Sequence, residues 1–118
     1  MRTLILAVTL GAMVAPVIAD DKYPTKPVTV LVPQAPGGAN DTIARLVAQK
    51  LTENLGQQFV VENRPGAGGN IGTALVARAP RDGYTLLLTV NSAHTTNPAL
   101  YKNPGFDPIK DFEAITPV

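Results

Sequence analysis

Two glycine-rich stretches carry the residues best suited to bind a ligand. The first, Pro36-Gly37-Gly38, stands just before Asp41, and the second, Pro65-Gly66-Ala67-Gly68-Gly69, stands just before Asn70. Glycine lets the main chain approach a ligand closely. A helix that begins at such a turn directs unpaired N–H groups and the positive end of its dipole toward the same place. The pattern predicts a site in which main-chain N–H groups bind a small anion.

Enzymatic readings of the same residues are weaker. The stretch 66–72 resembles a dinucleotide-binding fingerprint, but Ile71 stands where the third glycine is needed, and neither loop carries the lysine of a phosphate-binding P-loop. Ser92 and His94 are the one pair that suggests nucleophilic catalysis, and no strained nucleophile elbow surrounds the serine. An α/β enzyme, either a hydrolase or a cofactor binder, remains the alternative function. The sequence predicts no catalytic residue and no cofactor.

Asp41 has two readings that the sequence leaves open. Its carboxylate can offset the dipole of the helix that begins there, for about 0.3–1 kcal/mol, or it can orient a water molecule or accept a hydrogen bond from a ligand ammonium. Metal binding is disfavoured, because the chain has one histidine and no cysteine. The absence of cysteine also excludes disulfides and a thiolate nucleophile.

The elements that position these residues follow from the apolar pattern. Strands are predicted at 28–32, 59–62 and 84–90. Asn40 and Asn70 are predicted to cap the helices that follow the two glycine-rich stretches, and Gly56 is predicted to end the first helix. Large apolar side chains at helical spacing define the faces that we expect to be buried. In the first helix these are Ile43, Leu46, Val47, Leu51 and Leu55, and in the second Ile71, Ala74, Leu75 and Ala79.

The order strand, helix, strand, helix, strand, with short connections, predicts an α/β fold with a mainly parallel sheet and right-handed crossovers. Both glycine-rich loops then lie at the carboxyl ends of their strands, the edge at which open α/β sheets bind ligands. A polar loop with Asn91, Ser92 and His94 is predicted at the same edge. A short helix is expected near 99–101, irregular chain at 102–108, and a connection into a fourth strand at 111–118.

Residues 1–19 are predicted to be a secretory signal peptide. Arg2 gives a positive start, an apolar run follows, and Val17 and Ala19 suit a cleavage site before Asp20. Residues 20–118 then form the mature domain, with nine basic and nine acidic side chains once Arg2 is removed. No basic stripe remains to bind nucleic acid. The mature chain is expected in the periplasm, with no lipid anchor and no membrane insertion.

Several longer motifs resemble one family of receptors. Besides the two glycine-rich stretches, they are Tyr23-Pro24-x-Lys26-Pro27, Val61-Glu62-Asn63-Arg64-Pro65, Ala79-Pro80-x-Asp82-Gly83-Tyr84-Thr85, Asn97-Pro98-x-Leu100-Tyr101 and Phe106-Asp107-Pro108-x-Lys110-Asp111-Phe112. These resemble the Bug family, the periplasmic substrate-binding receptors of tripartite tricarboxylate transporters. The similarity covers nearly the whole mature chain.

The resemblance implies the first lobe of a type II periplasmic binding protein, an α/β lobe that closes with a second lobe over one small carboxylate. It implies a receptor rather than an enzyme, monomeric, that delivers its ligand to membrane permease subunits or, in a few members, meets a sensor protein. The ligand-binding residues that it implies, by matching position, are Gly37, Gly38, Asp41, Gly68, Gly69, Asn70, Asn91, Ser92 and His94.

Two departures from the family pattern affect these expectations. Gln34 stands where the family often has an aromatic residue near the ligand. Family members are also much longer, so the chain is interpreted as a fragment that stops before the second lobe. A ligand on one lobe keeps one side in water, and we therefore expect weak binding or none by this chain alone.

Overall fold

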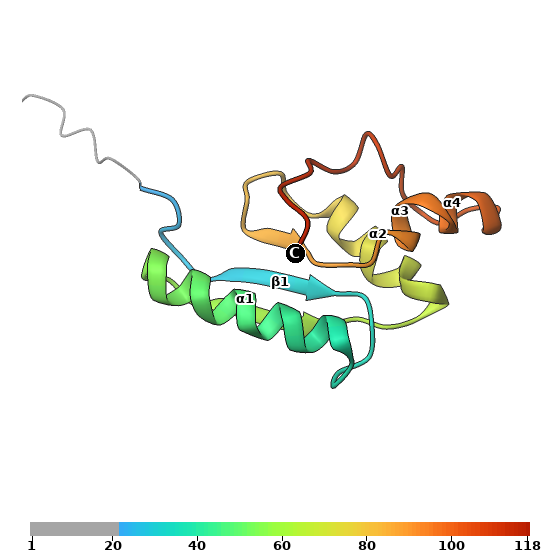
Figure 1. Ribbon diagram of the computed structural model, residues 1–118. Coiled ribbons are helices and arrows are strands. Elements are labelled where there is room, and N and C mark those ends of the chain that lie inside the picture. Colours follow the sequence, from blue (N-terminus) through green and yellow to red (C-terminus); the bar gives the residue numbers. More distant parts are fainter. Residues whose placement is uncertain (1–21) are drawn as a thin grey trace, which may run out of the picture.

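The computed structural model describes residues 22–118 and contains one parallel sheet of three strands (Figure 1). The strands are β1 (Val28–Val32), β2 (Phe59–Asn63) and β3 (Thr85–Leu87), in the order β2-β1-β3. Both neighbours run parallel to β1, with Val28 opposite Phe59 and Thr29 opposite Thr85. The predicted parallel α/β fold is confirmed.

Two helices cover opposite faces of this sheet (Figure 1). Helix α1 (Ala39–Leu55) joins β1 to β2, and α2 (Asn70–Arg78) joins β2 to β3 after a 3-10 turn, η1 (Ala67–Gly69). Because β1 is covered on both faces, its sequence is a nearly continuous apolar run. A core cluster joins β1 to α1 and β2, and it consists of Val28, Val30, Ala48 and Phe59.

The ends of the helices differ in part from the prediction. Gly56 ends α1 in the left-handed region at φ 74°, and its N–H donates to Thr52, as predicted. Asn40 and Asn70 are not the N-caps, because Gly38 and Gly69 hold those positions and make no side-chain cap bond. Instead, the carboxylate of Asp41, inside α1, accepts a hydrogen bond from the Gly37 N–H in the turn before the helix.

The predicted buried faces of both helices are wrong in their main members. In α1 the buried residues are Asp41, Ala44 and Ala48, whereas Leu46 is 59% exposed. Small side chains let α1 approach the strands closely, and of the large predicted side chains Leu51 packs, partly buried, against the core cluster. In α2 the buried face runs through Asn70, Gly72, Thr73 and Ala74, and Ile71 and Leu75 are exposed.

The last third of the chain is less regular than β1 and β2. Strand β3 ends at Leu87 rather than at 90, and the predicted polar loop forms two short helices, α3 (Ser92–Thr95) and α4 (Asn97–Leu100). The chain turns after Val90, whose carbonyl accepts a hydrogen bond from the Ala93 N–H. The helix predicted near 99–101 overlaps α4, and residues 102–108 are irregular as predicted. No fourth strand forms at 111–118.

The segment before β1 is clasped to the turn that precedes β3. The Tyr23 hydroxyl donates to the Gly83 carbonyl, and the Tyr84 hydroxyl accepts the Thr25 N–H at 3.0 Å. The two tyrosine rings meet edge to face at 5.2 Å, and the Lys26 ammonium lies 4.5 Å from the centre of the Tyr84 ring. These contacts fix the amino-terminal edge of the sheet.

The predicted signal peptide, residues 1–19, lies outside the described residues. Between residues 22 and 118, no helix has the length and apolar character needed to cross a bilayer. Over the same span, no group of three or more His, Cys, Asp or Glu side chains is arranged to hold a metal ion.

Candidate functional site

The two glycine-rich loops lie side by side at the carboxyl edge of the sheet. A Cβ atom built on Gly69 would stand 3.5 Å from the Pro33 carbonyl oxygen and 3.6 Å from the Gln34 amide nitrogen. A Cβ atom on Gly72, in α2, would stand 2.8 Å from Pro33 Cβ. Close packing between glycine and the facing main chain therefore sets the distance between the loops.

The first loop offers several main-chain donors, but Gly37 is not one of them. Gly37 adopts φ 85°, and its N–H donates to Asp41 Oδ2 at 2.9 Å. The first intrahelical bond of α1 runs from the Thr42 N–H to the Gly38 carbonyl. The N–H groups of Gly38, Ala39 and Asn40 have no acceptor among the described residues. These three free donors lie at the positive end of α1.

Asp41 is a buried and ionised carboxylate with one oxygen engaged. The residue is 4% exposed, and its Oδ2 accepts from Arg45 Nε at 3.0 Å as well as from Gly37. These hydrogen bonds, that of Arg45 foremost, lower the pKa of Asp41 from 3.8 to about 2. Its Oδ1 is buried and has no partner among the described residues.

The second loop engages two main-chain donors in its own turn. Gly68 and Gly69 have φ 65° and 93°, the Gly69 N–H donates to Gly66, and the Asn70 N–H donates to Ala67. The side chain of Asn70 is 5% exposed, and its Nδ2 has no partner among the described residues. The buried donor without a partner in this loop is therefore a side-chain amide.

Asn97 holds this second loop in place. Reasoning from the sequence did not predict this role. The Asn97 Nδ2 donates to the Gly68 carbonyl and to Asn70 Oδ1, both at 2.9 Å. Because an amide oxygen only accepts, the bond also directs Asn70 Nδ2 away from Asn97. The position of Asn97 before a proline, at the start of a helix, was the sequence signal for an ordered asparagine.

The third predicted segment contributes less than expected. Asn91 and Ser92 are exposed at the start of α3. His94 packs against the rings of Phe106 and Phe112, with centroids 6.1 and 4.9 Å away, and burial lowers the pKa of its imidazole. No hydrogen bond within residues 22–118 joins these three side chains to either glycine-rich loop.

Gln34 lies where all three loops meet. Its Nε2 is 3.5 Å from Thr89 Oγ1 beyond β3, and its carbonyl accepts from Asn63 Nδ2 at the end of β2. The buried polar side-chain atoms without a partner in the described chain are Gln34 Oε1, Asp41 Oδ1 and Asn70 Nδ2. Buried polar groups are almost always paired, with protein, water or ligand. The buried polar atoms that lack a hydrogen-bond partner therefore lie in or directly after the two glycine-rich loops.

The site is an open wall rather than an enclosed cavity. One hollow of about 380 Å³ lies between α1 and β2, and another of about 310 Å³ lies between α2 and residues 101–105. Neither hollow is lined by residues of both glycine-rich loops.

Residues 43–118 match the family described as the tripartite tricarboxylate transporter family receptor. A protein of Agrobacterium vitis, described as a UPF0065 protein in the TAR-I ttuE-ttuC' intergenic region, is 49% identical over 117 residues, which are 98% of this chain and 34% of that protein. Protein BugT of Bordetella pertussis is 49% identical over 86 residues, 73% of this chain and 26% of BugT. The chain thus spans about a third of the length of the relatives that it matches.

Solved structures show the same fold. The periplasmic binding protein BugD superposes with a TM-score of 0.73 at 50% identity, over 77% of this chain and 30% of BugD. MatC from Rhodopseudomonas palustris, solved with bound malate, gives 0.72 at 41% identity, over 76% of this chain and 31% of MatC. A further R. palustris protein, solved with adipate, gives 0.70 at 45% identity, over 73% of this chain and 29% of that protein.

Proposed function

Because this chain belongs to the tripartite tricarboxylate transporter receptor family, we propose that it is the ligand-binding wall of a periplasmic receptor for a small carboxylate. The observation that carries the proposal is the set of free donors at one sheet edge. The N–H groups of Gly38, Ala39 and Asn40 lie at the start of α1, and Asn70 Nδ2 lies in the neighbouring loop. A carboxylate has two oxygens that accept hydrogen bonds from such donors.

Similar proteins support the chemical class of the ligand. The R. palustris relatives were solved with malate and with adipate, both of which are small dicarboxylates. A buried, ionised Asp41 Oδ1 in the same loop suits an ordered water or a donor group of the ligand.

The remaining parts of the proposal concern the whole receptor. The lobe closes with a second one over the ligand and, as a monomer in the periplasm, delivers it to the permease subunits of a tripartite transporter or, less commonly, to a sensor protein. It performs no chemistry on the ligand. The open wall supports this division of labour, because one side of a bound carboxylate stays in contact with solvent until another lobe covers it.

Titration of the chain from Asp20 with malate and adipate, followed by amide NMR, tests the function. We expect millimolar binding at best, about −4 kcal/mol or weaker, with the largest shifts at the amides of Gly38, Ala39 and Asn40. The diamides of the same acids are the control, since they keep the carbon skeleton and lose the charge. Equal shifts with acid and diamide, or shifts centred away from the two loops, would overturn the proposal.

A matched pair of variants tests the second loop. Asn70→Leu keeps the approximate volume and removes the free Nδ2 donor, whereas Asn54→Leu makes the same change at an exposed position of α1. We expect Asn70→Leu to weaken the malate-induced shifts and Asn54→Leu to leave them unchanged. Equal behaviour of the two variants would remove Asn70 from the site.

A further inference from the structure

Asn63, the last residue of β2, bonds to two other elements through its side chain. Its Nδ2 donates to the Gln34 carbonyl at 3.2 Å, and its Oδ1 accepts from Arg45 Nη2 at 3.4 Å. A guanidinium only donates and a carbonyl oxygen only accepts, so these partners fix the orientation of the amide. One side chain thereby joins the end of β2, the middle of α1 and the loop after β1.

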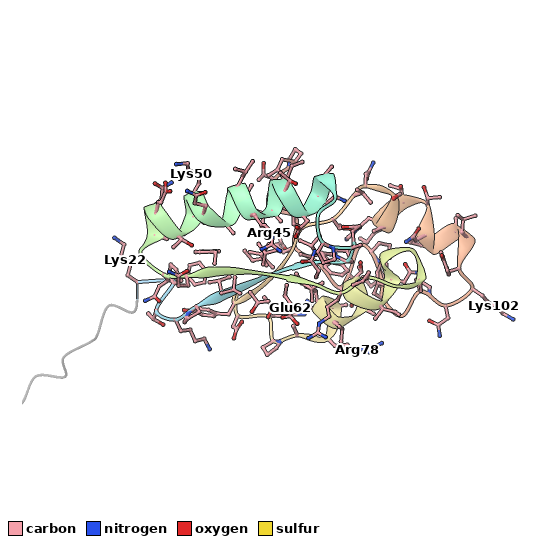
Figure 2. All side chains as sticks on the ribbon, turned by 90° about the horizontal axis from the view of Figure 1, so that it is seen from below. Lys22, Arg45, Lys50, Glu62, Arg78 and Lys102 are labelled. Carbon is pink, nitrogen blue, oxygen red and sulfur yellow. The ribbon has the colours of Figure 1, made fainter. Side chains whose placement is uncertain are left out.

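Arg45 continues this connection to the other end of the same loop. It reaches from α1 toward the strands (Figure 2), and its Nε donates to Asp41 Oδ2 at 3.0 Å. That oxygen also accepts the Gly37 N–H at 2.9 Å. A series of hydrogen bonds therefore begins at Gln34, passes through Asn63, Arg45 and Asp41, and returns to the loop at Gly37. This series uses both Nε and Nη2 of the Arg45 guanidinium, whereas a lysine has a single side-chain nitrogen.

We propose that Arg45 and Asn63 are positioning residues, which hold the first glycine-rich loop (33–38) in the form that receives the ligand. The proposal rests on the proposed function in calling this a ligand loop. The Asp41 carboxylate then orients Gly37 by accepting its N–H, and the ligand binds the following N–H groups at 38–40. Since Asn63 directly precedes Arg64-Pro65-Gly66, it also sets the first loop against the second.

A ligand-free measurement tests the connection. We expect the amide shift of Gly37 in the chain from Asp20 to stay flat between pH 3 and 6, because Asp41 stays ionised and Arg45 is the one charged side chain bonded to it among the described residues. In Arg45→Met the titration of Asp41 should move into this window, toward 3.8, and Arg45→Lys should restore the flat profile in part. Arg78→Met, at an exposed arginine of α2, should leave it flat. A wild-type titration inside the window, or a flat Arg45→Met profile, would overturn the proposal.

A ligand measurement tests the consequence for binding. Asn63→Asp is isosteric and removes the donor to Gln34, and Asn54→Asp makes the same change on the exposed face of α1. We expect Asn63→Asp to weaken the response of the Gly38 amide to malate at least tenfold, while the Asn70 side-chain amide keeps its response. Wild-type behaviour in Asn63→Asp, or an equal loss at both loops, counts against positioning. If the wild type shows no response to malate, this lobe alone does not bind it, and the pH profile of Gly37 decides the positioning role.

Discussion

Replacing Gly72 by alanine should destabilise the protein, although helix propensity alone predicts the opposite. Gly72 lies inside α2 with an ordinary helical conformation, where alanine is favoured over glycine by about 1 kcal/mol. An added Cβ would stand 2.6 Å from the Arg64 carbonyl oxygen, 2.8 Å from Pro33 Cβ and 3.0 Å from Leu31 Cδ2. Two of these neighbours, a main-chain oxygen and a proline ring, have little freedom to move.

The magnitude follows from these two opposing effects. Overpacking a close contact costs about 1–3 kcal/mol, and two rigid neighbours place Gly72→Ala near the upper end. After subtraction of the propensity gain, we expect a net loss of about 2 kcal/mol in the free energy of unfolding. Urea denaturation followed by circular dichroism measures this as a lower midpoint at unchanged slope.

Gly38→Ala is the matched control. Gly38 has φ −78°, which any residue adopts, and its Cβ would meet nothing closer than the Ala35 carbonyl oxygen at 3.7 Å. Reduced freedom of the unfolded chain should make this variant more stable by about 0.4–1 kcal/mol. The two alanine variants should therefore differ in opposite directions from the wild type. A Gly72→Ala variant as stable as the wild type, or more so, would refute the close packing of α2 on the first loop.

Three further predictions concern other contacts. The pKa of Asp41 is lower in the folded chain than its ordinary value of 3.8. The ionised carboxylate therefore stabilises the fold fully above pH 3.8, and this contribution is lost as the pH falls through about 2. In thermal melts, Asp41→Asn should lose less stability between pH 5 and pH 2 than the wild type. Val30→Ala, in the core cluster, should cost about 2–3 kcal/mol in urea denaturation, from lost burial and the cavity, and a cost below 1 would contradict its packing. Asn97→Ala removes bonds to Gly68 and Asn70 and should cost about 1–3 kcal/mol, with faster hydrogen exchange at the Gly69 amide; unchanged exchange there would exclude its role as a brace.

Much of the framework could be predicted because it rests on local signals. The β-branched run of β1, the glycine that ends α1 at position 56 and the order of elements each point to the parallel sheet without long-range information. The face of α1 could not be predicted in the same way. Hydrophobic spacing favours Leu46 as a core residue, but the distance between helix and sheet selects Ala44 and Ala48.

The candidate site divides along similar lines. Residue types and spacing identified both glycine-rich loops, but they did not show which donors are free. The Gly37 N–H is engaged because the Asp41 carboxylate accepts it, and the Gly69 N–H of the second loop closes the 3-10 turn. Likewise, nothing local indicates that His94 packs with Phe106 and Phe112, since that contact joins segments more than ten residues apart.

The contacts between Tyr23 and Tyr84 lie at the end of the sheet opposite the two glycine-rich loops. They hold the start of the described chain at the amino-terminal edge of the sheet, and five residues of β1 then lead to the loops, about 16 Å away at strand rise. Figure 2 places Lys22 at one extremity and Lys102 at the other. An affinity handle or surface linker joined at Lys22 is thereby kept clear of the ligand edge, which makes that end the natural point of immobilisation for binding measurements.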